Sequence, residues 1–332
     1  MHINYSVIIR TMGKADEKYQ KLLDSINKLE PKPQEAIIVL PEGYDLPKQR
    51  LNSGINERFI FCEKGMVNQR MVGINNCTTE YMLVCDDDIS FNYDFVQKLV
   101  QPINQNICDF SIGPLLSFLP PKGIKSIINN ITSGAVETIF NRNMYVKVLR
   151  SSGWSYNRNI NTKESRYYYT QSAAWTCFFA KTSSMHNIHF DEEKWLDMNG
   201  YASRDDMTMF YKAWLMGYKT VMVSDAIYEH LDAKTSTQGI KEKVIYSSSF
   251  NQLIFWYRFI YQVDTKFIMK CIDIISFLYY KSLTNVYMYL SILAKSKDKR
   301  VMNIRKKGFR DALKYIKSDE FKQLEKINVD IL

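Results

Sequence analysis

The stretch TTEYMLVCDDDI, residues 78–89, decides the fold. It opens with polar residues, continues through a short apolar run and ends in three adjacent aspartates, Asp86, Asp87 and Asp88. A short apolar run of this kind is typical of a strand that is buried on both faces. In open α/β sheets, ligands bind beyond the carboxyl ends of the strands. The sequence therefore predicts a binding site where this strand ends.

Other apolar runs alternate with amphipathic segments through the first hundred residues. Further buried strands are predicted at residues 5–10 (YSVIIR), 35–40 (EAIIVL) and 58–62 (RFIFC). Apolar residues at helical spacing predict helices at residues 18–29, 67–75 and 93–103. Strands that alternate with helices indicate an α/β fold with a mostly parallel central sheet.

The later part of the chain is predicted to complete this domain and then to become helical. Strands are predicted at 174–180 and 220–226, with an amphipathic helix at 206–216 between them. The polar and aromatic stretch 151–170 shows no period, so we expect a long structureless loop, which in a compact domain is usually a lid or a binding loop. After residue 246 helices are predicted at 250–262, 266–292 and 302–316. We therefore expect one large domain and a C-terminal helical extension.

The composition is that of a compact globular protein. The 332 residues are 46% hydrophobic and 14% aromatic, which excludes a disordered chain. No window reaches the roughly 18 apolar residues needed to span a bilayer, and the first residues lack the pattern of a secretory signal. Six scattered cysteines without a C-x-x-C pair fit buried thiols in a reducing compartment. These features together predict a cytoplasmic protein.

The net charge of +9 is concentrated near the C-terminus, where residues 281–332 hold 13 Lys/Arg and 6 Asp/Glu. Such a block is typical of a patch that meets phosphates on nucleic acid or on an anionic membrane, or of a solvated helix face. The basic residues are mixed with Leu, Ile, Met and Phe in helical order, which favours peripheral contact with a membrane surface. We expect no nucleic-acid partner.

Acidic residues and one histidine are the candidate site residues. Three adjacent carboxylates repel one another, so the aspartates at 86–88 indicate a divalent cation, Mg²⁺ or Mn²⁺, shared with substrate phosphates; the alternative is a simple acidic turn. Asp205 and Asp206 open a predicted helix, where they either cap it or supply a general base whose pKa is raised by its acidic neighbour. His230 follows a strand and is either a metal ligand or an ordinary histidine.

Several well-known phosphate and nucleophile motifs are missing from the sequence. It has no G-x-x-x-x-G-K-[ST] loop, no G-x-G-x-x-G after the first strand and no G-x-S-x-G elbow. Kinases, P-loop ATPases, dinucleotide-dependent dehydrogenases and α/β-hydrolases are therefore disfavoured. A phosphate-bearing ligand would have to be held by a metal ion and basic side chains instead.

Over about residues 4–232 the chain resembles family-2-type glycosyltransferases with the GT-A fold, of the kind that build bacterial surface polysaccharides. YSVIIRT is similar to the opening strand of that family, EAIIVLPEG to its nucleobase-contacting strand, and TTEYMLVCDDDI to the strand that enters its D-x-D motif. The segment from Glu63 to Arg70 resembles the one that approaches the diphosphate. The donor-binding residues that this resemblance implies are Thr11, Glu42, Lys64, Arg70, Asp86 and Asp87.

The stretch FDEEKWLDMNGYASRDDMTMFYKAWLMGYKTVMV, residues 190–223, resembles the acceptor-side block of the same family. Asp206 falls where the family places its catalytic base, and Asp205 where it places the acidic neighbour. The chain departs from the family pattern at Arg10, which stands where Pro is frequent, and at Glu42, where a pair of Asp is commoner. Arg204 beside the acidic pair is also unusual and leaves open which Asp is the base.

The resemblance implies transfer of a hexosyl group from a nucleotide diphosphate sugar, a UDP-sugar above all, to a hydroxyl of a saccharide or lipid-linked saccharide, with inversion, in surface polysaccharide synthesis. Mn²⁺ or Mg²⁺ is expected on Asp86, Asp88 and His230. Aromatic side chains that could pack on an acceptor sugar are Trp154, Tyr168 and Trp175.

The same resemblance divides the chain into three parts. Residues 1–105 are expected to bind the donor, residues 106–245 to bind the acceptor and catalyse transfer within the same GT-A domain, and residues 246–332 to form the basic helical extension. Two alternatives stay open, a sugar-phosphate nucleotidyltransferase and a non-enzymatic protein that binds saccharide or nucleic acid. The first normally needs a Gly-rich basic loop after its first strand, which Thr11-Met12-Gly13-Lys14 matches poorly.

Overall fold

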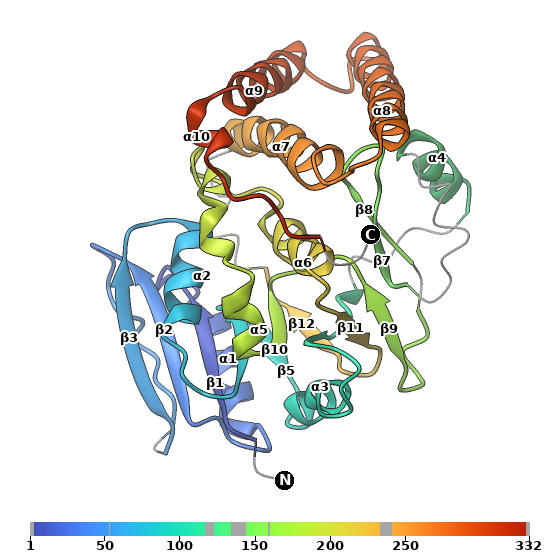
Figure 1. Ribbon diagram of the computed structural model, residues 1–332. Coiled ribbons are helices and arrows are strands. Elements are labelled where there is room, and N and C mark those ends of the chain that lie inside the picture. The colour runs from blue at the N-terminus through green and yellow to red at the C-terminus, as the bar shows by residue number, and fades with distance from the viewer. Residues whose placement is uncertain are drawn as a thin grey trace.

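A computed structural model describes residues 3–52, 54–116, 123–133, 144–158, 160–232 and 241–329 (Figure 1). Its central sheet has eight strands in the order β3-β2-β1-β4-β10-β6-β11-β9. The strands of this sheet are β1 (Tyr5–Arg10), β2 (Glu35–Pro41), β3 (Asn56–Cys62), β4 (Tyr81–Asp86), β6 (Phe110–Ile112), β9 (Tyr167–Thr170), β10 (Cys177–Lys181) and β11 (Thr220–Val223). Two small antiparallel pairs are formed by β5 (Ile89–Phe91) with β12 (Tyr228–His230) and by β7 (Val146–Val148) with β8 (Ser155–Asn157).

Helices surround the sheet and continue beyond it. They are α1 (Glu17–Lys28), α2 (Met66–Asn75), α3 (Phe95–Asn104), α4 (Ile124–Ser133), α5 (Thr182–Asn187), α6 (Asp205–Leu215), α7 (Lys241–Trp256), the π-helical turn η5 (Tyr257–Tyr261), α8 (Phe267–Leu293), α9 (Lys299–Ile316) and α10 (Asp319–Lys322), with short 3₁₀ turns η3 (Phe190–Glu192) and η4 (Lys194–Leu196). Figure 1 shows α7, α8 and α9 gathered at one end of the molecule, above the sheet.

The prediction of a mostly parallel α/β sheet is confirmed. Strands β3, β2, β1 and β4 all run parallel, as do β6 and β11, while β10 and β9 run antiparallel to their neighbours. Alternate residues of β1 face opposite sides of the sheet: Ile8 packs in one core cluster with Ile74 of α2, and Val7 packs in the other with Leu22 of α1. Helices thus cover both faces, which explains why the strand sequences are apolar throughout.

Helix α2 lies very close to the sheet because it carries a glycine at the contact. A Cβ atom on Gly73 would lie 2.5 Å from Cγ2 of Ile8 and 3.0 Å from Cγ2 of Val39. The N-terminal end of α2 is held from the other side by Asp197, whose carboxylate accepts hydrogen bonds from the backbone N–H groups of Met66, Val67 and Asn68 at 2.9, 3.0 and 3.1 Å. The position of α2 is therefore fixed at both its face and its end.

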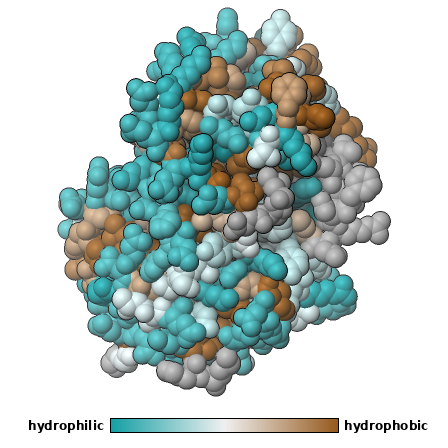
Figure 2. All heavy atoms as spheres, viewed as in Figure 1, coloured by the Kyte–Doolittle hydropathy of each residue, from teal (hydrophilic) through white to brown (hydrophobic). Residues whose placement is uncertain are grey.

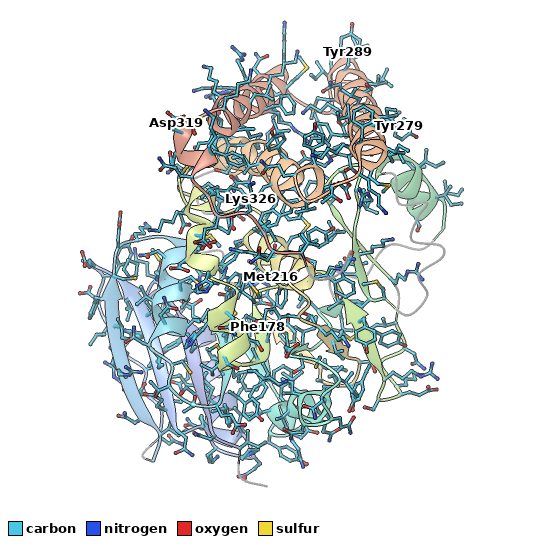
Figure 3. The ribbon with its side chains drawn as sticks, in the orientation of Figure 1. Phe178, Met216, Tyr279, Tyr289, Asp319 and Lys326 are labelled. Atoms are coloured by element: carbon cyan, nitrogen blue, oxygen red, sulfur yellow. The ribbon has the colours of Figure 1, made fainter. Side chains whose placement is uncertain are left out.

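The C-terminal region is a packed part of the fold and not a free arm. Helix α9 lies against α7, where a Cβ atom on Gly308 would meet the carbonyl oxygen of Tyr246 at 2.6 Å, and Ala312 and Tyr315 are buried in the contact. Helix α8 is different, because much of its apolar surface is exposed. Figure 3 shows Tyr279 and Tyr289 projecting from α8, whereas Phe178 lies inside the domain.

Several predicted boundaries and one predicted loop were wrong. The stretch 151–170 is not structureless, because it contains β8 and β9; Tyr167–Thr170 (YYYT) is the edge strand of the main sheet, and an edge strand needs no alternation of apolar residues. The predicted strand 174–180 begins at Cys177, and helix α7 begins at residue 241, earlier than predicted. The predicted helix 266–292 is one continuous helix, α8.

All six cysteines are free thiols, and five of them are buried, as predicted. Within the described ranges, none of the helices combines the length and the apolar character that crossing a bilayer requires.

Candidate active site

The three aspartates lie where β4 leaves the sheet, beside the end of β1. The parallel register places Arg10, the last residue of β1, opposite Asp86, the last residue of β4. Asp86, Asp87 and Asp88 are each more than nine-tenths buried. Burying three carboxylates is costly unless each is paired, so their partners define what the site can do.

Arg70 of α2 is the partner of Asp86 and also joins it to α6. Its Nη2 lies 3.0 Å from Oδ1 of Asp86, and its Nη1 donates to Oδ2 of Asp205. Its guanidinium carbon lies 4.8 Å from the centre of the Trp175 ring. Burial alone would lower the pKa of Arg70, but the carboxylates of Asp86 and Asp205 raise it. A buried, permanently charged cation therefore bridges the sheet-edge acids and the start of α6.

Asp87 is turned toward the loop that follows β1. Its Oδ2 accepts a hydrogen bond of 2.5 Å from the hydroxyl of Thr11, and that hydroxyl accepts one of 2.9 Å from the backbone N–H of Gly13. Burial raises the pKa of Asp87 to about 6, although Arg10 opposes the shift. Asp87 thus fixes the loop after β1, the place where the resemblance to the family puts the donor.

Asp88 pairs with His230, because β5 and β12 bring the two segments together. His230 lies opposite Ile89 in this ladder, and its Nε2 is 3.3 Å from Oδ1 of Asp88. The hydrogen bond to Asp88 raises the pKa of His230. The backbone N–H of Leu231 also donates to the carbonyl oxygen of Asp88 at 2.7 Å.

The Asp88–His230 pair fits a divalent ion in its chemistry and in its spacing. A carboxylate oxygen and an imidazole nitrogen are ligands that Mn²⁺ accepts, and neighbouring ligands of a six-coordinate ion are roughly 3 Å apart when each bond is about 2.1 Å. The carboxylate of Asp86, the third predicted ligand, is bound by Arg70 and Arg10. Among the described residues, no group of three or more His, Cys, Asp or Glu side chains is arranged to hold a metal by itself. Further ligands would have to come from a substrate.

The two carboxylates at the start of α6 have different surroundings. Asp205 is bound to Arg70, whereas Oδ1 of Asp206 accepts a 2.6 Å hydrogen bond from the backbone N–H of Met207. Burial, and after it the negative charge of Asp205, raises the pKa of Asp206 to about 7. A carboxylate with such a pKa is suited to accept a proton near neutral pH.

Asp206 lines a cavity of about 210 Å³ between α6 and the segments around β7, β8 and β10. Trp154, Arg204 and Asn157 line the same cavity. Trp154 is 39% exposed, so part of its indole faces the solvent. The cavity therefore brings a proton acceptor and an aromatic face together, a combination that suits a sugar hydroxyl.

The other two predicted aromatic positions lie elsewhere. Trp175 is only 2% exposed, packs against Phe178 and Phe190 in the core, and is not among the residues that line the cavity containing Asp206. Its indole lies under Arg70 and helps to position that guanidinium. Tyr168 of β9 is partly buried against the core and is not among the residues that line the cavity. Residue type alone could not tell a core aromatic from a ligand-binding one.

Glu42 and Lys64 lie at the ends of β2 and β3 and are exposed. The structure does not join them to the acidic cluster. Lys64 Nζ lies 2.7 Å from the hydroxyl of Tyr44, and Lys14 Nζ lies 5.0 Å from the centre of the same ring.

Three residues that contact the acidic cluster, its loop or a predicted donor-binding residue were not among the predicted site residues. Arg10 binds Asp86, Gln69 donates to the carbonyl oxygen of Thr11 at 3.2 Å, and Tyr44 accepts a hydrogen bond from Lys64. Arg10 could have been found, because the predicted register of two parallel strands that both end at the site places it there. Gln69 and Tyr44 carry no such signal in the sequence.

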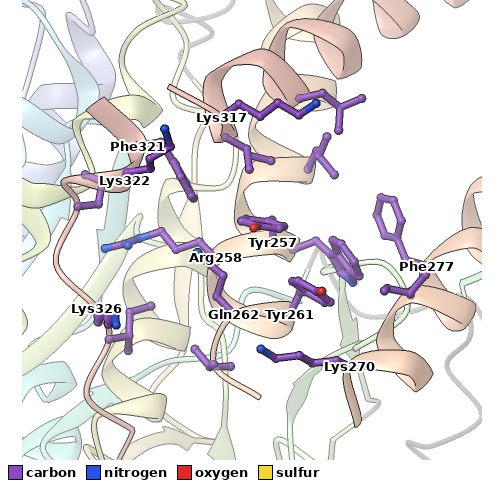
Figure 4. A pocket seen from close by; sticks show the side chains of 18 of the residues that line it. Tyr257, Arg258, Tyr261, Gln262, Lys270, Phe277, Lys317, Phe321, Lys322 and Lys326 are labelled. Carbon is purple, nitrogen blue, oxygen red and sulfur yellow. The ribbon is translucent and has the colours of Figure 1, made fainter. Parts of the chain in front are cut away.

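A cavity of about 1560 Å³ lies away from the acidic cluster (Figure 4). It lies in the helical extension, between η5, α8, α9 and the segment that follows α10, and none of the predicted site residues lines it. Apolar and aromatic side chains make up most of its wall. The lysines on its lining are Lys270, Lys317, Lys322 and Lys326.

The structure thus brings the sheet-edge acids and the carboxylates at the start of α6 together through one bridging arginine. The model of the family "Glycosyl transferase family 2" matches residues 6–178, just over half of the chain. The chain belongs to glycosyl transferase family 2 and is a glycosyltransferase, as the resemblance predicted. A search of curated protein sequences found no match.

Solved structures show the same fold. The S. aureus TarS 1–349 structure in complex with UDP-GlcNAc is 13% identical, has a TM-score of 0.53 and is matched over 94% of this chain and 81% of that chain. S. aureus TarS 1–349 without that ligand gives 17% identity and a TM-score of 0.47 over 83% of this chain and 71% of that one. GalNAc-T7 with UDP, GalNAc and Mn²⁺ gives 12% identity and a TM-score of 0.49 over 77% of this chain and 50% of that one. The TarS 1–349 structure with UDP-GlcNAc, together with the family match, confirms the GT-A-like fold predicted from the sequence.

Proposed function

We propose that the protein transfers a hexosyl group from a UDP-sugar to a hydroxyl of a saccharide or lipid-linked saccharide, with inversion at the anomeric carbon. Family membership supports transfer of a sugar, and the UDP-GlcNAc bound to the similarly folded TarS supports a UDP-sugar donor. The observation that carries the proposal is the bridge from Asp86 through Arg70 to Asp205. It places a buried cation between the sheet edge, where a diphosphate would bind, and the helix that carries the candidate base.

We assign donor binding to residues 1–105. Thr11, Arg70, Asp86 and Asp87 form the floor of this site, and Glu42 and Lys64 at the strand ends would reach the nucleoside. Asp88 and His230 would hold Mn²⁺ or Mg²⁺, with Asp86 next to them on Arg70; a bound ion would supply positive charge to the leaving diphosphate. Arg70 adds positive charge of its own, held in a buried position where it acts strongly on a developing negative charge.

We assign acceptor binding and proton transfer to residues 106–245. The acceptor hydroxyl would give its proton to the carboxylate of Asp206 while its oxygen forms the new bond to the anomeric carbon. The bond from that carbon to the diphosphate breaks at the opposite face, and its electron pair leaves with UDP. Asp205 keeps the pKa of Asp206 high and holds Arg70, so we assign it a positioning role.

We further propose that residues 246–332 support peripheral contact with the inner face of the cell membrane during surface polysaccharide synthesis. The basic charge of this region supports the idea. The apolar side of α9 is packed on α7. We therefore propose α8, and not α9, as the helix that contacts the membrane. Figure 2 shows apolar side chains gathered on this part of the surface, and Phe267, Ile268, Ile275 and Leu293 of α8 are each more than 60% exposed.

The test of the proposed function is a donor panel with the purified protein. UDP-glucose, UDP-GlcNAc, UDP-galactose and matching GDP-sugars are incubated with and without Mn²⁺, and slow donor hydrolysis is followed by release of the nucleoside diphosphate. We expect a Mn²⁺-dependent signal with at least one UDP-sugar. Absence of binding and hydrolysis with every donor, in a protein shown to be folded, would overturn the proposal.

A further inference from the structure

Arg204 is a buried arginine with part of its guanidinium unpaired. The residue is 6% exposed and directly precedes α6. Its Nη1 donates to the carbonyl oxygen of Gly153 at 2.7 Å, and its guanidinium carbon lies 3.9 Å from the centre of the Trp154 ring. Its Nε and Nη2 are buried and have no hydrogen-bond partner among the described residues. One face and one nitrogen are therefore engaged, and one edge is free.

Two other buried arginines show what such an edge normally does. Arg258 uses the same two nitrogens, Nε and Nη2, to hold the two oxygens of Glu193 at 3.0 and 2.9 Å. Arg70 holds Asp86 and Asp205. Within the described residues, Arg204 has no carboxylate in contact. Burial lowers its pKa to about 10, so it remains charged at neutral pH. A buried charge without a partner is costly, and the cost points to a function.

Arg204 is one of the residues that line the cavity containing Asp206, although its Nε and Nη2 are themselves buried. Arg204, Trp154 and Asp206 all line this space of about 210 Å³. The remaining polar lining consists of uncharged side chains, Ser155, Asn157, Ser172, Ser203 and the tyrosines Tyr145 and Tyr228. Among the described residues that line the cavity, Arg204 is therefore the one cationic side chain. The adjacent N–H groups at Nε and Nη2 of an arginine match the two oxygens of a carboxylate or phosphate.

We infer that Arg204 binds a carboxylate or phosphate group carried by a saccharide substrate, so that the enzyme selects an acidic sugar over its neutral counterpart. This inference rests on the proposed function, because it takes the cavity beside Asp206 as the place where sugars meet. The acidic group sits either on the transferred sugar or on the acceptor. In both cases it would orient a hydroxyl of the reacting pair toward Asp206.

The experiment measures affinity for acidic and neutral probes that differ in one group. In the donor arm, UDP-glucuronic acid is compared with UDP-glucose in the presence of Mn²⁺. In the acceptor arm, D-glucuronic acid is compared with D-glucose, and glycerol 1-phosphate with glycerol, each with and without UDP. Isothermal calorimetry gives the affinities for wild type, Arg204→Gln and the control Arg166→Gln, an arginine whose side chain is 59% exposed.

We expect the acidic probe to bind at least about tenfold more tightly in one of the arms, as befits a buried charge-assisted pair. We expect that preference to disappear in Arg204→Gln and to persist in Arg166→Gln. The arm that shows the preference identifies the substrate that carries the acidic group. Equal affinities in both arms, or a preference that survives Arg204→Gln, would overturn the inference.

A second measurement needs no variant and guards against a misfolded Arg204→Gln. Titration of wild-type protein with D-glucuronic acid, followed by NMR of the arginine Nε–H groups, should shift one resonance that D-glucose leaves in place. Absence of any such shift with every acidic probe overturns the inference. UDP binding to wild type is recorded separately: if UDP fails to bind, the proposed function fails, whereas an acidic preference without UDP would still support the role of Arg204.

Discussion

Two buried ion clusters flank helix α6, and they are built in opposite ways. The anchoring cluster consists of Glu193, Lys212 and Arg258; Glu193 is fully buried, and its oxygens lie 3.0 Å from Lys212 Nζ and 2.9 Å from Arg258 Nη2. Burial would raise the pKa of Glu193, but Lys212 and Arg258 outweigh it and lower the pKa. Every charge in this cluster has a partner, and its effect is to join α6 to the helical extension.

The bridging cluster, Arg70 with Asp86 and Asp205, is surrounded by groups that are not fully matched. Asp206 and Asp87 next to it have pKa values raised to about 7 and about 6 by burial. Buried acidic and basic side chains thus serve different purposes in the two clusters. Complete pairing makes a rigid joint, and incomplete pairing leaves groups whose protonation can change at neutral pH, which is where chemistry is expected.

The largest expected effect is a loss of activity, and we expect it at the bridging cluster and not at the anchoring cluster. Asp206→Asn removes the candidate base and should lower transfer by about a thousandfold, within the range that general bases contribute. It should not lower the melting temperature, because the raised pKa means that the charged carboxylate destabilises the fold at neutral pH. Initial rates and thermal melts check this, with the exposed Asp191→Asn as the matched control. A variant with wild-type rates would remove Asp206 from the mechanism.

The converse change should act on stability. Glu193→Gln leaves Lys212 and Arg258 without their buried counter-charge and should cost about 3 kcal/mol in the free energy of unfolding. Urea unfolding gives that value. The neighbouring Glu192, which lies 3.1 Å from Lys212 Nζ and whose side chain is 26% exposed, offers the control: Glu192→Gln should cost under about 1 kcal/mol. Equal costs for the two variants would mean that the anchoring cluster has no special role.

A smaller effect is expected at the pair of Asp88 and His230. If this pair holds the ion, His230→Ala should weaken Mn²⁺ binding by about tenfold or more in the presence of UDP, in line with the loss of one ligand or its support. Electron paramagnetic resonance of free Mn²⁺ measures the binding without reference to activity. Unchanged Mn²⁺ affinity would exclude His230 from the site and leave its contact with Asp88 as a structural one.

The finest distinction is a shift in pH dependence. Asp206 must be deprotonated to accept a proton, so kcat/KM should fall as the pH drops below about 7, the pKa to which burial and Asp205 raise this group. In Asp205→Asn the like charge is gone and Arg70 is freed, and both changes favour the charged form of Asp206. The pH at which kcat/KM begins to fall on the acidic side should therefore be lower by about one unit. A limb that stays in place would mean that another group controls the rate.

The sequence predicted where the three aspartates lie, at the end of a buried strand, because that position follows from local patterns. Apolar strands ending in acids place Asp86 and Asp88 without further information. The same reasoning could not foresee that Arg70 binds Asp205, which is 135 residues away in the chain, or that Trp175 belongs to the core. Edge strand β9 was missed for a related reason: its stability comes from pairing with β11, and its own residues show no periodic burial.

The division into residues 1–105, 106–245 and 246–332 remains a proposal. The structure locates the cavity with Asp206 in the second of these parts, together with Arg204 and Trp154. The sequence places Arg204 beside Asp206 but could not join Trp154 to them, since Trp154 lies in a stretch without a recognisable period. Only the folded structure, which packs the start of α6 near this stretch, shows that Trp154 lies close to Asp206.

The carboxylate of Asp197 on the first turn of α2 has a consequence for how phosphate is handled. Helix starts commonly receive anions through their free amides, yet here a tethered carboxylate has already taken three of them. An incoming diphosphate would have to displace part of the protein's own chain to use that end. If a diphosphate binds at this edge of the sheet, its charge would therefore be met by side chains and ions and not by the start of α2, which Asp197 already occupies.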